Sequence, residues 1–251
     1  MAKKDSLKQQ KFMSFMFRGK EIFKPLNTGH IDERVSCIRE YVANIYFYSK
    51  DGYTIMIDAG YNYDRLAEKM RWIDIRPESI NEIIVTHQDT DHVGAIEVDS
   101  QGLFKTAKIY VGRVENEYLE GRVRRKVYWG LYKLPQVHIE NDKTLIEDGE
   151  IFYIHDIKIE AFLVPGHTWG HLVYLIDDAY LFTGDTIWFG ADGGYAFLNT
   201  LAEDRKLQSV SLKRLEEKLR KRNPSLKIIT GHTGWTDDFD FAFRHVDEIC
   251  N

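Results

Sequence analysis

The sequence has little cysteine and no long apolar run, and each shortage excludes a class of protein. Two cysteines among 251 residues, Cys37 and Cys250, are too few for a disulfide framework, so we expect both to be structural. No apolar stretch approaches the roughly 20 residues that span a bilayer. The basic N-terminus lacks the apolar segment of about 7–15 residues that marks a secretory signal. We therefore expect a cytoplasmic protein with no membrane partner.

The chain also lacks an excess of basic residues. Its net charge of −5 disfavours a nucleic-acid-binding surface, which normally carries a basic excess. A hydrophobic content of 43% is sufficient for one well-packed core. We predict a flexible lead-in over residues 1–20 and a single domain over residues 21–251.

Apolar runs separated by glycine-rich turns indicate a mixed α/β domain. The predicted strands include residues 38–48 and 53–58, joined by a hairpin turn with Asp51-Gly52 at its centre. Helical patterns cover residues 63–70, 113–134, 211–222 and 240–249.

The most informative segment is Thr86–Gly94, which follows an apolar run. It places four ligand-type side chains within six positions, namely His87, Asp89, Asp91 and His92. Convergence of nearby carboxylates is costly unless a positive charge lies between them. The segment therefore predicts a site for one or two divalent metal ions.

Three later loops repeat this pattern of an apolar run, a glycine and a ligand-type residue. They contain His167 with His171, then Asp185, then His232. Loops at strand ends are where rigid scaffolds place their chemistry. We therefore expect these loops to contribute to the same site.

With these motifs in order, the chain resembles the metallo-β-lactamase superfamily, whose members carry a His-x-His-x-Asp-His motif and three later ligands. Residues 181–190 resemble the pattern of glyoxalase II and related hydrolases. The resemblance implies a four-layer αβ/βα sandwich, with the metal site at one edge. One departure is Asp89, which stands where the family motif has its second histidine.

The resemblance also implies a ligand set. His87, Asp89 and His167 would hold one metal ion, while Asp91, His92 and His232 would hold a second. Asp185 would bridge the two ions. His92 is the weakest member of the set because this position turns away from the metal in some members. His171 is expected to form a hydrogen bond within its loop instead. Imidazole and carboxylate ligands suit zinc, which we expect first, and also iron or manganese.

Asp89 changes the expected charge of this centre. Together with Asp91 and Asp185 it cancels three of the four charges of two divalent ions, which weakens their Lewis acidity. The pattern is similar to that of the flavodiiron branch, where a glutamate occupies this position. Aspartate is one methylene shorter, so the likeness is partial.

Two functions from different classes follow from the resemblance. The first is a hydrolase that attacks an ester, lactone, thioester or phosphoester small molecule with a metal-activated hydroxide, with Asp91 orienting the nucleophile as the catalytic residue. The alternative is a non-haem diiron protein that binds, reduces or senses oxygen or nitric oxide. We expect the hydrolase; a degenerate, metal-free scaffold ranks third.

The basic, aromatic residues 113–134 bear on the substrate. Arg122, Arg124 and Arg125 could attract an anionic substrate, or they could lie on a solvated helix face with the neighbouring aromatics in the core. The sequence leaves the oligomeric state open.

Overall fold

The computed structural model describes residues 23–61, 63–97, 102–222 and 225–249. The predicted lead-in over residues 1–20 and Cys250 lie outside these ranges. Cys37 is buried, and its thiol donates a hydrogen bond to the Asn27 carbonyl (3.2 Å). Burial raises the pKa of the Cys37 thiol to about 11, which fits the structural role expected for it.

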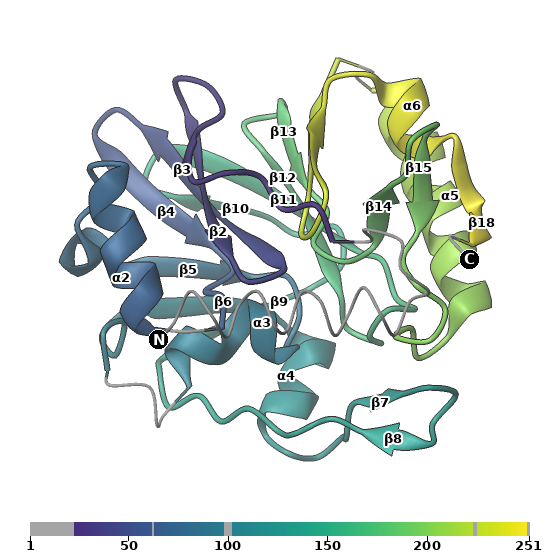
Figure 1. Ribbon diagram of the computed structural model, residues 1–251, viewed down its shortest axis with the longest axis horizontal. Coiled ribbons are helices and arrows are strands. Elements are labelled where there is room, and N and C mark those ends of the chain that lie inside the picture. The colour runs from purple at the N-terminus through teal and green to yellow at the C-terminus, as the bar shows by residue number, and fades with distance from the viewer. Residues whose placement is uncertain (1–22, 62, 98–101, 223–224, 250–251) are drawn as a thin grey trace.

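Two mixed sheets form the body of the molecule (Figure 1). The first has seven strands in the order β1 (Gly29–His30), β2 (Val35–Glu40), β3 (Ala43–Lys50), β4 (Tyr53–Ile57), β5 (Glu82–Val85), β6 (Lys108–Gly112) and β9 (Lys143–Ile146). The second has six, in the order β10 (Ile151–Ile154), β11 (Ile157–Leu163), β12 (Leu172–Ile176), β13 (Tyr180–Phe182), β16 (Lys227–Thr230) and β17 (Gly234–Thr236). A smaller sheet joins β14 (Ile187–Phe189), β15 (Gly194–Ala196) and β18 (His245–Ile249), and a hairpin pairs β7 (Lys126–Val127) with β8 (Tyr132–Lys133).

The alternation of side chains along the strands explains why the two sheets stack. Along β3, Ile45 and Phe47 belong to a cluster on the outer face of the first sheet. Tyr46 and Tyr48 point the other way, into a cluster that also contains Tyr174 of the second sheet. Both faces of the strand are therefore buried, and the second cluster lies between the sheets.

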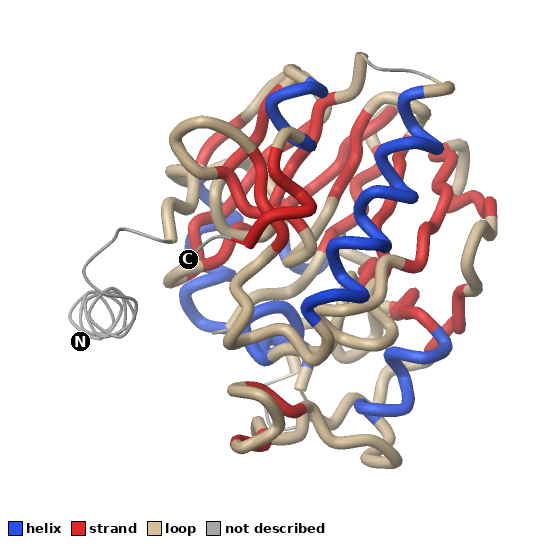
Figure 2. The backbone as a smooth tube through the Cα atoms, turned by 90° about the vertical axis from the view of Figure 1, so that its right-hand side faces the viewer, coloured by secondary structure: helices blue, strands red, loops and turns tan. Residues whose placement is uncertain are grey.

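Helices cover the two outer faces, so that the molecule has four layers (Figures 1 and 2). The first sheet is flanked by α2 (Tyr63–Trp72), α3 (Thr90–Val93) and α4 (Arg113–Leu119), with 3₁₀ turns η1 (Pro77–Ser79) and η2 (Gly94–Ile96). The second is covered by α5 (Arg205–Arg220) and α6 (Phe239–Phe243). Leu212, Leu215 and Leu219 of α5 pack in the same cluster as Val173 of β12. The predicted αβ/βα sandwich is confirmed.

Three element predictions were wrong. Residues 38–48 form two strands, because the chain turns at Tyr41-Val42, with Glu40 paired to Ala43. Residues 113–134 are helical only to Leu119 and then form the β7–β8 hairpin. Residues 240–249 comprise the end of α6 and the strand β18, which pairs in parallel with β15.

Two predicted helices were right in kind. α2 extends the prediction over residues 63–70 by two residues, and α5 begins six residues before the predicted start at residue 211. None of the helices in the described ranges is both long and apolar enough to cross a bilayer.

Hydrogen bonds join the two sheets at one edge. The Asn44 N–H of β3 donates to the Gly231 carbonyl (2.7 Å), and the Tyr46 hydroxyl donates to the Thr230 carbonyl (2.7 Å). The loop that carries His232 is therefore attached to the first sheet as well as to its own.

Candidate metal centre

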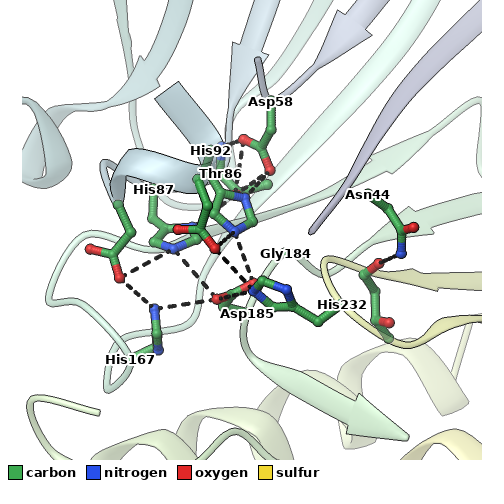
Figure 3. Close-up of polar contacts among 12 residues, drawn as sticks. Asn44, Asp58, Thr86, His87, His92, His167, Gly184, Asp185 and His232 are labelled. Atoms are coloured by element: carbon green, nitrogen blue, oxygen red, sulfur yellow. Dashed lines mark hydrogen bonds and ion pairs between the residues drawn. The ribbon is translucent and has the colours of Figure 1, made fainter. Parts of the chain in front are cut away.

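Four loops, drawn from both sheets, bring the ligand-type side chains to one edge of the sandwich (Figure 3). The loop after β5 carries His87, and the loop between β11 and β12 carries His167. Asp185 follows β13, and His232 follows β16, the strand parallel to β13. The sequence therefore predicted correctly that these loops lie together.

The first group of possible ligands consists of His87, His167 and Asp185. Asp185 Oδ2 lies 3.8 Å from His87 Nε2 and 3.7 Å from His167 Nε2. Ligand atoms around a tetrahedral ion at about 2.0–2.2 Å lie roughly 3.3–3.6 Å from one another. The spacing of these atoms is close to that of a tetrahedral site.

The second group consists of Asp91, His92 and His232. Asp91 Oδ2 lies 3.5 Å from His232 Nε2 and 3.8 Å from His92 Nε2. Asp185 also faces this group, with Oδ2 3.0 Å from His232 Nε2 and Oδ1 3.2 Å from His92 Nε2. Asp185 therefore lies between the two groups, in the position that the resemblance implied for a bridging ligand.

Several buried polar atoms at the centre lack the partners that protein groups usually have. His87 Nε2, His92 Nε2 and Asp185 Oδ1 make no hydrogen bond with the described residues, although the last two atoms lie 3.2 Å apart as an ion pair. A Cβ atom at Gly231 would lie 2.4 Å from Asp185 Oδ1, so the glycine leaves the space beside this carboxylate open. Unpartnered nitrogen and oxygen atoms around such a space fit a divalent metal ion.

Asp58, at the end of β4, orients two of the imidazoles and was not identified as a site residue from the sequence. Its carboxylate contacts His92 Nδ1 (2.8 Å) and accepts a hydrogen bond from the Thr86 hydroxyl (2.8 Å). The same hydroxyl lies 3.0 Å from His87 Nδ1. Because the Thr86 hydroxyl donates its hydrogen bond to Asp58, it accepts one from the His87 Nδ1–H. Nε2 of His87 and Nε2 of His92 are then free to bind a metal ion.

His232 is held in the same way by the backbone. Its Nδ1 contacts the Val42 carbonyl (2.7 Å), which leaves Nε2 facing the two carboxylates. Val42 belongs to the turn between β2 and β3 that the sequence did not reveal.

Asp89 lies beside the first group, although it is not a member of it. Its Oδ2 is 3.2 Å from His167 Nε2 and 3.7 Å from His87 Nε2. Both carboxylate oxygens also accept hydrogen bonds from Arg125, at 2.9 Å from Nε and 3.1 Å from Nη2. Arg125 is only 2% exposed, so this arginine is not on a solvated face.

Electrostatic coupling within the centre sets its protonation states. Burial would raise the pKa of the Asp185 carboxyl, but His232 and His92 hold this pKa well below its usual value. Burial, reinforced by the neighbouring His92, lowers the pKa of His87 well below its usual value. Burial would lower the pKa of His92, but Asp185 and Asp58 raise it well above its usual value. An ionised carboxylate and a neutral His87 are the forms that bind metal ions, which then compete with protons for His92.

Two further histidines, His171 and His30, belong to neither ligand group. His171 Nε2 accepts a hydrogen bond from the Asp185 backbone N–H (3.1 Å), and its ring stacks on His87. Its partner is thus in the next loop and not in its own, and His171 belongs to neither ligand group. His30 is exposed and contacts the Ser36 hydroxyl at the edge of the first sheet.

An apolar wall formed by Phe23, Trp188 and Phe197 packs against the imidazoles. Phe197 meets the ring of His167 edge-on (4.9 Å between centroids), and Trp188 lies 6.1 Å from the ring of His232. Within the ligand set, only the Asp91 (28%) and Asp89 (11%) side chains have appreciable exposure. Water therefore reaches the centre from the side of these two carboxylates.

This fold and this centre define a class of metal-binding αββα proteins, and comparison with known proteins supplies the family. Residues 38–232 match the model of the metallo-beta-lactamase superfamily, and the chain belongs to this superfamily. A probable polyketide biosynthesis zinc-dependent hydrolase, BaeB of Bacillus velezensis, is 26% identical over 71% of this chain and 67% of its own length. A hydroxyacylglutathione hydrolase of Buchnera aphidicola is 28% identical over 55% of this chain, but the match covers only 44% of that protein's length.

Solved structures agree on the fold. A structure described as a B3 metallo-beta-lactamase with an active-site glutamic acid superposes with a TM-score of 0.65, at 16% identity, over 91% of this chain and 89% of that one. The predictions of the superfamily, the fold class and an enzyme of the hydrolase class are therefore confirmed.

Proposed function

We propose that this chain hydrolyses an ester, lactone, thioester or phosphoester small molecule by means of two divalent metal ions, zinc first among them. The observation that carries this proposal is the place of Asp185 between two groups of possible ligands, each of which contains an imidazole Nε2 with no hydrogen-bond partner among the described residues. The names of relatives, a zinc-dependent hydrolase and hydroxyacylglutathione hydrolases, support it and put acylglutathione thioesters first among the substrates to test.

In this proposal the seven predicted residues hold the ions: His87, Asp89 and His167 at the first position, Asp91, His92 and His232 at the second, and Asp185 between them. The ions would supply an acidified water and a Lewis acid for the substrate oxygen. Asp91, the most exposed of the carboxylates, would orient the attacking water and accept its proton. The apolar wall of Phe23, Trp188 and Phe197 would exclude bulk water from the far side.

The diiron alternative depends on the additional negative charge of Asp89. In the structure the guanidinium of Arg125 lies against this carboxylate and offsets its charge. Asp89 therefore adds little net negative charge to the centre, which favours the zinc hydrolase that we propose over an iron-preferring centre.

The test combines metal analysis with turnover. The protein purified without added metal should contain about two zinc ions, and Asp185→Ala should lose zinc and reduce turnover roughly a hundredfold or more. Asp156→Ala is the matched control, because Asp156 is an exposed carboxylate in the turn at the opposite end of β11. Full metal content and full turnover in Asp185→Ala would disprove the two-metal site. Two irons, with an absorption band that responds to oxygen, would favour the diiron function.

A further inference from the structure

Arg125 is a buried cation that donates four hydrogen bonds beside the first metal position. Besides its two hydrogen bonds to Asp89, its Nη1 donates to the Lys126 carbonyl (3.0 Å) and its Nη2 to the Leu201 carbonyl (2.6 Å). The same Nη2 lies 3.2 Å from His167 Nε2. The guanidinium is thus fixed in orientation by three segments of the chain.

A buried guanidinium is costly unless a carboxylate compensates it. Asp89 supplies that carboxylate by accepting two hydrogen bonds from Arg125, at 2.9 Å and 3.1 Å, and the pair has no net charge. The family motif has a neutral histidine at this position, so the pair provides a ligand of the same formal charge.

We propose that Arg125 is a positioning residue that converts Asp89 into the electrical equivalent of a neutral ligand and thereby weakens the first metal position relative to the second. This inference rests on the two-metal centre proposed above. A charge effect acts at the first position only. The cation beside Asp89, whose Nη2 also lies 3.2 Å from His167 Nε2, repels an incoming divalent ion.

The second position has no such cation. Asp91 makes no ion pair with lysine or arginine among the described residues, and its partners there are the imidazoles of His92 and His232. Asp58 adds a further carboxylate behind His92. We therefore expect two zinc ions of unequal affinity, with the first position the weaker.

The experiment is a zinc titration of the metal-free protein in competition with a chromophoric chelator. The wild-type protein should bind one zinc tightly and a second more weakly. Arg125→Met should tighten the weaker site about tenfold or more, because an uncompensated carboxylate attracts the ion, and should leave the tight site unchanged. Arg125→Lys, which keeps the charge, should remain near the wild type. The double variant Asp89→His with Arg125→Met should also return to it, because both charges are then removed together.

Arg122→Met is the matched control. Arg122 belongs to the same segment but is exposed and pairs with Glu117 and Glu120, so both zinc affinities should be unchanged. The absorption of cobalt(II) bound at the weaker site gives a second readout, since its intensity should change in Arg125→Met and recover in the double variant.

Three outcomes would overturn the inference: two sites of equal affinity in the wild type, weaker or unchanged binding in Arg125→Met, or failure of the double variant to restore the wild-type affinity. If Arg125→Met does not fold, the zinc titration of Asp89→Asn tests the inference instead. This variant removes the carboxylate that accepts two hydrogen bonds from the guanidinium and should weaken the first position more than tenfold, so wild-type affinity would contradict us. If the titrations follow the expectation but no substrate is turned over, the hydrolase function fails while the role of Arg125 stands.

Discussion

At the residue scale, Asp58 supports two imidazoles through one carboxylate. It contacts His92 directly and His87 through the Thr86 hydroxyl. We predict that Asp58→Asn lowers the zinc affinity about 10- to 100-fold, because the amide is a weaker acceptor for the His92 ring and its orientation is less fixed. Chelator competition measures the change. Asp51→Asn, in the exposed β3–β4 turn, is the control, and equal affinities in the two variants would refute the role of Asp58.

Glu115, at the start of α4, gives a prediction about pH. Its buried carboxyl accepts hydrogen bonds from the Gln88 N–H and the Thr168 hydroxyl, and burial raises its pKa to about 8 from 4.5. Between these two values the unfolded chain binds fewer protons at this group than the folded protein does. The group therefore makes the free energy of unfolding fall as the pH rises from about 4.5 to about 8.

Glu115→Gln should remove this dependence. Relative to the wild type, the variant should gain stability between pH 5 and pH 8, by an amount on the order of a few kcal/mol. Urea unfolding at several pH values in this range measures it. The exposed Glu140→Gln should follow the wild type throughout, and a variant whose stability runs parallel to that of the wild type would contradict the shifted pKa.

The ligand-type residues were identifiable from the sequence because their loops follow apolar runs, and in the three later loops the ligand-type residue comes directly after a glycine. Arg125 was not identifiable as the partner of Asp89, because the pairing depends on where the fold places the segment that enters the β7–β8 hairpin. Asp58 was missed for a similar reason: its two partners lie on the loop after β5, a strand away in the sheet.

At the scale of elements, the N-terminus of α5 holds the His167 loop. The Asp204 side chain caps this helix by accepting from the Leu207 N–H (2.9 Å). Its backbone N–H donates to the Gly166 carbonyl (2.9 Å), and a Cβ at Gly166 would collide with Gln208. The first turn of α5 and the loop are thus packed together.

Asp204→Ala should cost about 1 kcal/mol of stability through loss of the cap, while Asp204→Ser should cost only a few tenths. Zinc affinity should change little, because the backbone hydrogen bond to Gly166 is retained. Chemical denaturation with and without zinc separates the two effects. A large loss of zinc affinity with unchanged stability would show that the carboxylate acts on the site directly.

The three wrong element predictions have different physical causes. Tyr41 adopts a left-handed φ of 50° in a two-residue hairpin that contains no glycine, proline or asparagine, so residues 38–48 read as one strand. In the β7–β8 hairpin, Tyr128 and Trp129 also have positive φ, and Trp129 is 69% exposed, contrary to the expectation of buried aromatics. The strand β18 exists because a distant segment, β15, pairs with it. Local pattern cannot supply that partner.

At the scale of the whole molecule, the proposed ligands come from loops of both sheets. Removal of metal with a chelator should therefore lower the melting temperature, since only the folded chain brings these loops together. For zinc at about a hundred times its dissociation constant, the stabilisation is roughly 2.7 kcal/mol, which corresponds to about 5–10 °C for a chain of this size. Calorimetry before and after chelation, with zinc added back, measures it. An unchanged melting temperature would mean that the ions are not held between the sheets.

The hydrogen bonds from Asn44 and Tyr46 to the His232 loop bear on how the molecule is assembled. Asp91 and His232 come close together only when the His232 loop is bonded to the first sheet, and neither half of the chain contains all the proposed ligands. The zinc content of the protein therefore reports whether the two sheets have assembled. A chain cut between β9 and β10 should give two fragments that each bind zinc poorly alone. When mixed, the fragments should associate and bind zinc again.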